Sequence, residues 1–538
     1  MSQLPLLTIL LACPVLGLAA ILVTPARYPG AIRRIAAASG LAAAAVVVVL
    51  WMRFDPQAPG FQFVERVRWV PSFGIEWHDG VDGLNLPLLA LTAIVFLTGV
   101  LVMWELEERV KEYFALMTLL VIGVYGVFMT LDLFFFVFYY EVAVLPMYLL
   151  IAVWGSTRKE YGAMKLTLYL LVGTALVVPA ALALYWGAGQ GTFDLTRLAA
   201  AHYGRSFQLL VYPFLFVGFG ILAGTALVVP AALAVYWAAG LGSFDLVRLA
   251  HAHYGHTFQL IVYPFLFVGF GVLAGLWPFH TWSPVGHVAA PTAVSMLHAG
   301  VLMKLGAYGI LRVGMSVLPE GAHYWAGTTA VFATINIVYG AFVALAQTDL
   351  KFVVGYSSVS HMGIVLLGLS TLSVDGMNGA VFQMFSHGIM TALFFAAVGY
   401  IYDRYHTRDI EKLGGLSTQI PVASAFFIVA ALTGAGVPAF SSFWAELLVF
   451  LGTLKTYPVL AVIVVFALTL TLAYSIRVIV LGFFGQPREA HPAVADISAF
   501  LATPRAILVA VLLILGFYPR LILDVIDPAV RALTGVLS

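Results

Sequence analysis

Apolar segments of about 20 residues follow one another along almost the whole chain, and this feature limits the fold more than any other. A run of that length is what an α-helix needs to cross the hydrocarbon core of a bilayer. Backbone groups in a bilayer must be hydrogen-bonded within the protein, and runs this long and continuously apolar indicate helices. The predicted runs are 4–23, 36–52, 84–104, 114–131, 133–154, 164–187, 209–238, 259–277, 292–311, 328–346, 352–371, 378–401, 421–453, 456–484 and 504–523.

Composition supports this interpretation and excludes several other classes of protein. Of the 538 residues, 62% are hydrophobic and only 9% are charged, whereas soluble domains carry about 25% charged residues. The net charge of +1 gives no support for a nucleic-acid partner. Cys13 is the single cysteine, which excludes a cysteine-ligated iron–sulfur cluster and an intrachain disulfide. The sequence predicts an all-α polytopic membrane protein.

Basic residues between the early runs predict its orientation. They cluster around Arg33, Arg109 and Lys159, in the segments that follow the first, third and fifth runs. If every run crosses once, all three clusters lie on one side. Cytoplasmic loops are enriched in Lys and Arg, so this side is predicted to be cytoplasmic.

A tandem duplication interrupts the regular succession of runs. Residues 173–223 recur almost letter for letter as 224–274, and Asp194 corresponds to Asp245 at an offset of 51 positions. The duplication inserts the apolar run 209–238, whose two halves copy the end of one helix and the start of another. Such high similarity indicates a recent event.

Two of the runs are broken by helix-terminating residues. Pro278, Pro284 and Pro291 separate one apolar run from the next, and each proline opposes continuation of a helix. The second break, within 421–453, contains Gly434, Gly436 and Pro438. One interrupted helix in each half of a membrane protein is a sequence signal for a transport site.

Few ionisable residues lie inside the apolar runs, and such residues are functional candidates by default. A lysine at the centre of a span costs about 2.5–3.5 kcal/mol on insertion scales. The alternative interpretation of Lys304 is a side chain that extends to the membrane surface, and a buried histidine can simply be a satisfied core residue. Haem ligation by two histidines is possible in principle, but no pattern pairs them. The candidates are Glu141, His298, Lys304, His361, His387 and Glu446, with Asp132 expected at an interface.

Four stretches resemble the antiporter-like membrane subunits of respiratory complex I, and among these the subunit M (chain 4) type. They are PFHTWSPVGH with APTAVSMLHAGVLMKLGAYGILR, then QTDLKFVVGYSSVSHMG, FQMFSHG and YDRYHTRDIEKLGGL. The resemblance covers nearly the whole chain outside the inserted copy.

This resemblance implies about fourteen transmembrane helices plus the inserted segment, arranged as inverted five-helix repeats that each hold a broken helix. It implies that no redox cofactor is bound, that protons are translocated when quinone is reduced elsewhere, and that L-, N- and K-like membrane subunits are partners in a bacterial inner membrane. The proton-path residues carried over are Glu141, Lys304, His361, His387 and Glu446. The predicted divisions are N-terminal helices 1–112, a first repeat 113–312, a second repeat 328–484 and a C-terminal helix 485–538.

The chain departs from the family pattern in its first half. A lysine is expected at Leu273 and a proline at Gly275, and the acid expected in Pro-Asp-x-His is replaced by Val285. Glu141 therefore lacks the cation that the family pattern would supply. Lys304, or water and polar groups, would have to take its place. Two alternatives to a complex I proton channel remain: a D-type subunit of a multisubunit cation/proton antiporter, and a non-pumping structural subunit.

The inserted run 209–238 is predicted not to make a simple single crossing. The flanking loops 188–208 and 239–258 are near copies and should prefer the same side, whereas a single crossing would place the basic loop around Arg404 outside. Labelling of single cysteines placed at Gln190 and at Leu241 tests this, with equal accessibility from one side as the expected result. Labelling from opposite sides, with the Arg404 loop still cytoplasmic, would contradict the prediction.

Overall fold

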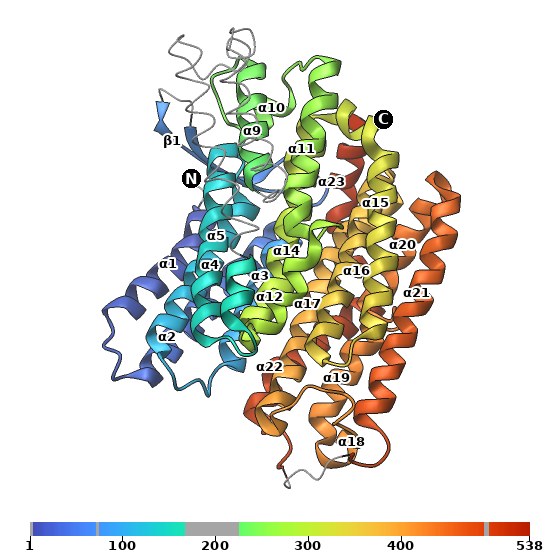
Figure 1. Ribbon diagram of the computed structural model, residues 1–538. Helices are drawn as coiled ribbons and strands as arrows, with labels where there is room; N and C mark the ends of the chain where they lie inside the picture. Colours follow the sequence, from blue (N-terminus) through green and yellow to red (C-terminus); the bar gives the residue numbers. More distant parts are fainter. Residues whose placement is uncertain (1–3, 72–74, 167–224, 489–493, 538) are drawn as a thin grey trace, which may run out of the picture.

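The computed structural model describes residues 4–71, 75–166, 225–488 and 494–537, and it is a bundle of roughly parallel helices (Figure 1). Within these residues, eleven helices are long and apolar enough to cross a membrane. The prediction of an all-α polytopic membrane protein is confirmed. The first five helices are α1 (Leu6–Val23), α2 (Pro29–Arg53), α3 (Leu86–Val102), α4 (Val110–Met129) and α5 (Leu133–Trp154).

The helices form a row that begins with α1 and α2 at one edge and ends with α20 and α21 at the other (Figure 1). Between these edges the described helices are α9 (Thr225–Ala239), α10 (Leu246–Ala250), α11 (His256–Ala274), α15 (Pro319–Ala346), α16 (Leu350–Ser370) and α17 (Val374–Tyr405). The second edge is made of α20 (Ser441–Thr456) and α21 (Pro458–Val478), which continues as the π-helical turn η5 (Ile479–Phe483). Every residue in the most hydrophobic part of α17 is buried inside the protein, so this helix lies at the centre of the described bundle.

The first predicted break is present, and its two sides differ in structure. Helix α11 ends at Gly275, which has a left-handed φ of +82°. The short elements η2 (Phe279–Thr281) and α12 (Trp282–Ala289) follow. The expectation that all three prolines interrupt the helix is wrong for Pro284, which lies in the first turn of α12, where its missing N–H is not needed.

Beyond Pro291 the chain forms one long helical run, residues 292–315, which is buried in all but its first residue. It comprises α13 (Thr292–Leu297), the π-helical turn η3 (His298–Leu302), α14 (Met303–Gly309) and a second π-helical turn η4 (Ile310–Met315). A π-helical turn changes the direction of side chains and is frequent at functional sites. Both turns flank the α14 segment that carries Lys304.

The second predicted break separates α19 (Pro421–Gly434) from α20. Gly436 has a φ of +66°, a conformation that residues with a Cβ rarely adopt. A Cβ on Gly436 would also lie 2.5 Å from Oε2 of Glu446. Glycine is therefore required at this position by both the backbone and the adjacent carboxylate.

A β-hairpin is the exception to the helical fold among the described residues. Strands β1 (Gln62–Val70) and β2 (Ile75–Val81) pair antiparallel within the long polar stretch of the sequence. The hairpin covers Asp132, whose side chain accepts from the N–H groups of Phe134 and Glu76. Asp132 caps α5 at the junction with α4 and is buried beneath the hairpin, and this burial raises its pKa to about 6.

The second copy of the duplication supplies α9, α10 and α11, and α9 packs along α11. Its loop is tied to the hairpin by Asp245, which lies 3.2 Å from Nδ1 of His78 and 3.1 Å from Arg66. The first copy and most of the inserted run, residues 209–224, lie outside the described residues. The prediction for that run therefore stays a prediction.

The C-terminal segment 485–538 contains two described helices where a single one is predicted. Helix α22 (Ala499–Phe517) is apolar, and α23 (Arg520–Leu537) contacts α17 and α15 near the end of the bundle that holds the hairpin (Figure 1). The short helix α18 (Leu416–Gln419) lies at the opposite end.

A buried ion pair joins the end of the long run to the loop that follows the hairpin. Nη2 of Arg312 lies 2.7 Å from Oδ2 of Asp82, and Nε of Arg312 donates to the hydroxyl of Tyr308 at 3.0 Å. Removing one member of a buried pair leaves an uncompensated charge, whereas replacing both members can be nearly neutral.

We expect Arg312→Met to lower the free energy of unfolding by about 3–5 kcal/mol, because Asp82 loses its partner. Asp82→Asn added to Arg312→Met should restore most of the loss. Thermal unfolding of the purified protein measures both effects. Arg531→Met, which removes an exposed pair with Asp527, is the control and should cost less than about 1 kcal/mol. Equal losses in the Arg312 and Arg531 variants would contradict the prediction.

Candidate functional site

Lys304 is fully buried on α14, and its amine is bonded inside the protein. The Nζ atom lies 2.6 Å from Nδ1 of His387 on α17. It also donates to the backbone carbonyl of Ala299, which belongs to the π-helical turn η3. An amine held by an imidazole and a carbonyl does not extend to the membrane surface, so that alternative interpretation of Lys304 is wrong.

The next member of the site is a stacked pair of histidines. The rings of His387 and His361 are 5.3 Å apart between centroids, at an interplanar angle of 28°. Nδ1 of His361 lies 2.8 Å from the carbonyl of Ser357, and Nε2 lies 3.0 Å from the carbonyl of Gly434. Carbonyl oxygens only accept hydrogen bonds, so both contacts of His361 are satisfied together when the ring is doubly protonated.

Glu446 lies beyond this pair, on α20. Its carboxylate is buried, with Oε1 at 3.6 Å from Nε2 of His361 and at 3.5 Å from Nε2 of Gln383. The charge of a protonated His361 would therefore be balanced by Glu446. The break before α20 makes this arrangement possible, because Gly434 exposes its carbonyl to His361 and Gly436 leaves space for the carboxylate.

The four residues form a row in the order Lys304, His387, His361 and Glu446, which differs from their order in the sequence. The row crosses four helices, α14, α17, α16 and α20, and so runs from the centre of the bundle toward the edge that α20 and α21 form. A change of charge at one member alters the proton affinity of the next through the short distances between them. The arrangement can therefore move a proton and pass on an electrostatic signal, and we call it the central row.

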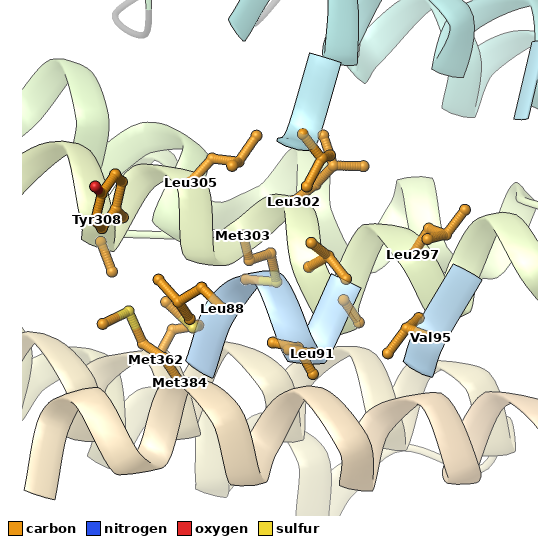
Figure 2. Close-up of a cluster of buried hydrophobic side chains, with 14 of the residues drawn as sticks. Leu88, Leu91, Val95, Leu297, Leu302, Met303, Leu305, Tyr308, Met362 and Met384 are labelled. Carbon is orange, nitrogen blue, oxygen red and sulfur yellow. The ribbon is translucent and has the colours of Figure 1, made fainter. Parts of the chain in front are cut away.

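A cluster of buried apolar side chains lies where α3 packs against the long run and α17 (Figure 2). Leu88 and Leu91 of α3 lie with Met303 and Met384 (Figure 2). Met303 directly precedes Lys304 in the sequence, and Met384 lies three residues before His387. All four of these apolar side chains are fully buried. Electrostatic interactions are stronger beside such buried apolar groups than they are in water.

Glu141 is placed differently from the other four predicted residues. It lies half-buried on α5 and lines a cavity of about 320 Å³ together with Val137, Ala232 and Phe244. The contacts that join the central row do not include it. Leu273, where the resemblance implies a lysine, is a buried aliphatic side chain on α11.

The structure adds site residues that the sequence interpretation missed. Gln383 contacts Glu446. It lies one helical turn before His387, so its spacing in the sequence already places it on the same face of the helix as that histidine. Lys351 is a second buried lysine among the described residues. Its Nζ donates to the carbonyl of Ala290 at 2.7 Å. In the described ranges, no three histidine, cysteine or acidic side chains are arranged to hold a metal ion.

The fold and the central row define a polytopic membrane protein with ionisable residues lined up across its helices. Residues 130–229 and 219–471 match the NADH:quinone oxidoreductase/Mrp antiporter transmembrane family, and the chain belongs to that family. The two matches meet within the duplicated region, so the duplication divides the family's sequence pattern.

Curated relatives and solved structures agree with this assignment. The chain is 34% identical to NADH-quinone oxidoreductase subunit M of Rhodobacter capsulatus, over 91% of this chain and 87% of the relative. It is 33% identical to NAD(P)H-quinone oxidoreductase chain 4 1 of Synechococcus elongatus, over 99% and 92%.

Among solved structures, a chain of respiratory complex I from Thermus thermophilus with bound NADH superposes with a TM-score of 0.80 at 22% identity, covering 99% of this chain and 100% of that one. A chain of the Mrp complex from Dietzia sp. superposes with a TM-score of 0.76 at 20% identity, covering 100% of both. At sequence identities of 20–22%, the structural similarity establishes the fold alone. Chains from both kinds of complex have this fold.

We expect Gly436→Ala to disturb the second break, because the new Cβ meets the Glu446 carboxylate in a strained backbone conformation. The free energy of unfolding should fall by about 1–3 kcal/mol. Thermal unfolding measures this loss against Gly482→Ala, whose Cβ would meet no heavy atom within 4 Å. Identical melting temperatures for the two variants would contradict the prediction.

Proposed function

We propose that this protein is a proton-translocating membrane subunit of an NADH–quinone oxidoreductase, and that it conducts protons when quinone is reduced elsewhere in the complex. The observation that carries the proposal is the central row, in which a buried amine, two imidazoles and a buried carboxylate lie in sequence. Amines, imidazoles and carboxylates at these distances can exchange protons with one another. Curated relatives of subunit M type support the choice of complex.

The geometry suggests how the row would work. In one state the proton is on Lys304, whose ammonium donates to His387. Transfer toward His361 places positive charge beside Glu446, where the carboxylate stabilises it. Each transfer changes the charge that the neighbouring group experiences, so a perturbation at one end of the row can drive proton release at the other.

Several finer points belong to the same proposal. Glu141 would tune the first half of the path, and Glu446 would terminate the path in the second half. The protein would bind no redox cofactor of its own. Its partners would be L-, N- and K-like membrane subunits, and its location would be a bacterial inner membrane, where the basic loops face the cytoplasm.

A D-type subunit of a cation/proton antiporter is the second candidate, because the Mrp chain shares the fold. Purification of the native complex distinguishes the two. Co-purified NADH- and quinone-binding subunits support the proposal, whereas co-purified antiporter subunits and cation-driven proton movement in vesicles would support the second candidate.

We expect Lys304→Ala to abolish most proton translocation in vesicles that contain the assembled complex. The amine is the donor to His387, and removing a positioned proton-transfer group typically slows transfer by about 10²–10⁴-fold. Translocation is measured per quinone reduced and per amount of assembled complex. Lys455→Ala, at an exposed lysine paired with Asp375, is the matched control and should behave as wild type. Normal translocation in Lys304→Ala would refute the proposal.

A further inference from the structure

A hydrogen-bonded tyrosine connects an outer helix with the central row. Helix α21 lies at the edge of the bundle (Figure 1), and 33% of its most hydrophobic part is buried, so its inward-facing side is narrow. Tyr474 is on that side, with its side chain buried. Its hydroxyl donates to Oγ of Ser357 on α16 at 2.8 Å. This contact joins α21 to the residue one helical turn before His361.

Ser357 presents two oxygen atoms to the same nitrogen of His361. Nδ1 of His361 lies 2.8 Å from the carbonyl oxygen of Ser357 and 3.3 Å from its Oγ atom. A carbonyl oxygen can only accept, so Nδ1 carries a proton in this contact. The serine hydroxyl is favourable beside that N–H only when its oxygen, and not its proton, faces the ring.

The tyrosine determines which way the serine hydroxyl is turned. A serine hydroxyl can donate one hydrogen bond and accept two. The phenolic proton of Tyr474 occupies one acceptor position of the Ser357 oxygen, and the Nδ1–H of His361 occupies the other. With both positions taken, the serine proton points away from the imidazole. Without the tyrosine hydroxyl the serine proton is free to rotate toward Nδ1, where it can be accepted only by a ring that has lost its Nδ1 proton.

The charged and titratable groups around His361 come from three other helices. The carboxylate of Glu446 on α20 faces Nε2, the ring of His387 on α17 stacks on the imidazole, and Lys304 of α14 lies behind His387. The carboxylate favours the protonated ring, and the positive charge of Lys304 opposes it. The two oxygens of Ser357 add to the effect of the carboxylate, because hydrogen bonds to the charged form of a group favour that form.

We propose that Tyr474 is a positioning residue for proton transfer, which through Ser357 favours the doubly protonated form of His361. The tyrosine exchanges no proton in this role. It sets the pH range in which His361 accepts a proton, and it makes the outer helix α21 part of the machinery of the row. The inference rests on the proposed function, because it concerns the proton affinity of a member of the row that carries it.

A second tyrosine provides a matched comparison on the same pair of helices. The hydroxyl of Tyr457, the residue before α21, donates to the carbonyl of Ser370 on α16 at 3.3 Å. Ser370 ends α16, and at a rise of about 1.5 Å per residue it lies roughly 13 Å along the helix from His361. Loss of the Tyr457 hydroxyl therefore weakens the docking of α21 on α16 without touching the serine beside the imidazole.

The first test measures proton translocation over a range of pH in vesicles that contain the assembled complex. Tyr474→Phe removes the hydroxyl and keeps the ring that packs in the core. We expect the pH at which translocation falls to half its maximum to move lower by about 0.5–1 unit, as the loss of one hydrogen bond implies. The direction follows because a His361 that binds its proton less tightly loses it at a lower pH.

Two further variants assign the shift to the proposed contact. Ser357→Ala should move the profile as well, and adding Tyr474→Phe to it should give no further shift, because the two groups act through one contact. Tyr457→Phe should keep the wild-type profile. An unchanged profile in Tyr474→Phe, or an equal shift in Tyr457→Phe, would overturn the inference.

The second test observes the imidazole directly and does not depend on translocation. In NMR spectra of the complex labelled with ¹⁵N-histidine, the His361 signal is identified by its loss in His361→Gln. The ring should stay doubly protonated to a higher pH in the wild-type protein than in Tyr474→Phe, and identical titrations would overturn the inference. The two proposals fail separately. Loss of translocation in Lys304→Ala with a wild-type pH profile in Tyr474→Phe removes only this one, whereas a wild-type complex that does not translocate protons removes the proposed function.

Discussion

The buried amine of Lys304 is the interaction on which the rest of the structure depends. A charged group inside a membrane protein is tolerated only if the protein supplies partners for its donors. The partners here are the imidazole of His387 and the carbonyl of Ala299. The first requires α17 to pass directly beside α14, and the second accompanies the π-helical turn η3. The central position of α17 in the bundle and the irregular helix before α14 both follow this requirement.

The two interrupted helices serve the same need for polar groups at membrane depth. The carbonyl groups of a helix interior are already bonded within the helix, whereas those at a helix end are left without an intrahelical partner. The break after α19 exposes the carbonyl of Gly434, which faces His361, and the conformation of Gly436 leaves space for Glu446. The break after α11 similarly surrounds His287 and His298, which are fully buried with ring centroids 4.1 Å apart. Non-helical backbone at membrane depth is tolerated where protein or a water-filled cavity supplies its hydrogen-bond partners.

The first half of the protein departs from the family pattern more than the second half does. The first half has a buried aliphatic side chain at Leu273, while it holds the histidine pair close to the same break. The central row joins Lys304 of the first predicted repeat to His387, His361 and Glu446 of the second.

The sequence by itself determined the class of the protein, the two breaks and the chemical nature of the site residues. Apolar runs of a fixed length, prolines and glycines within them, and rare ionisable residues are local signals, and the membrane makes each of them costly to misplace. Only the tertiary structure decided the order of the row, the distances within it, and the pairing of His287 with His298. Those contacts join residues up to 85 positions apart, as between His361 and Glu446, and they depend on how α16, α17 and α20 pack. Helix packing is decided by the fit of all side chains at once, so spacing along the chain does not reveal it.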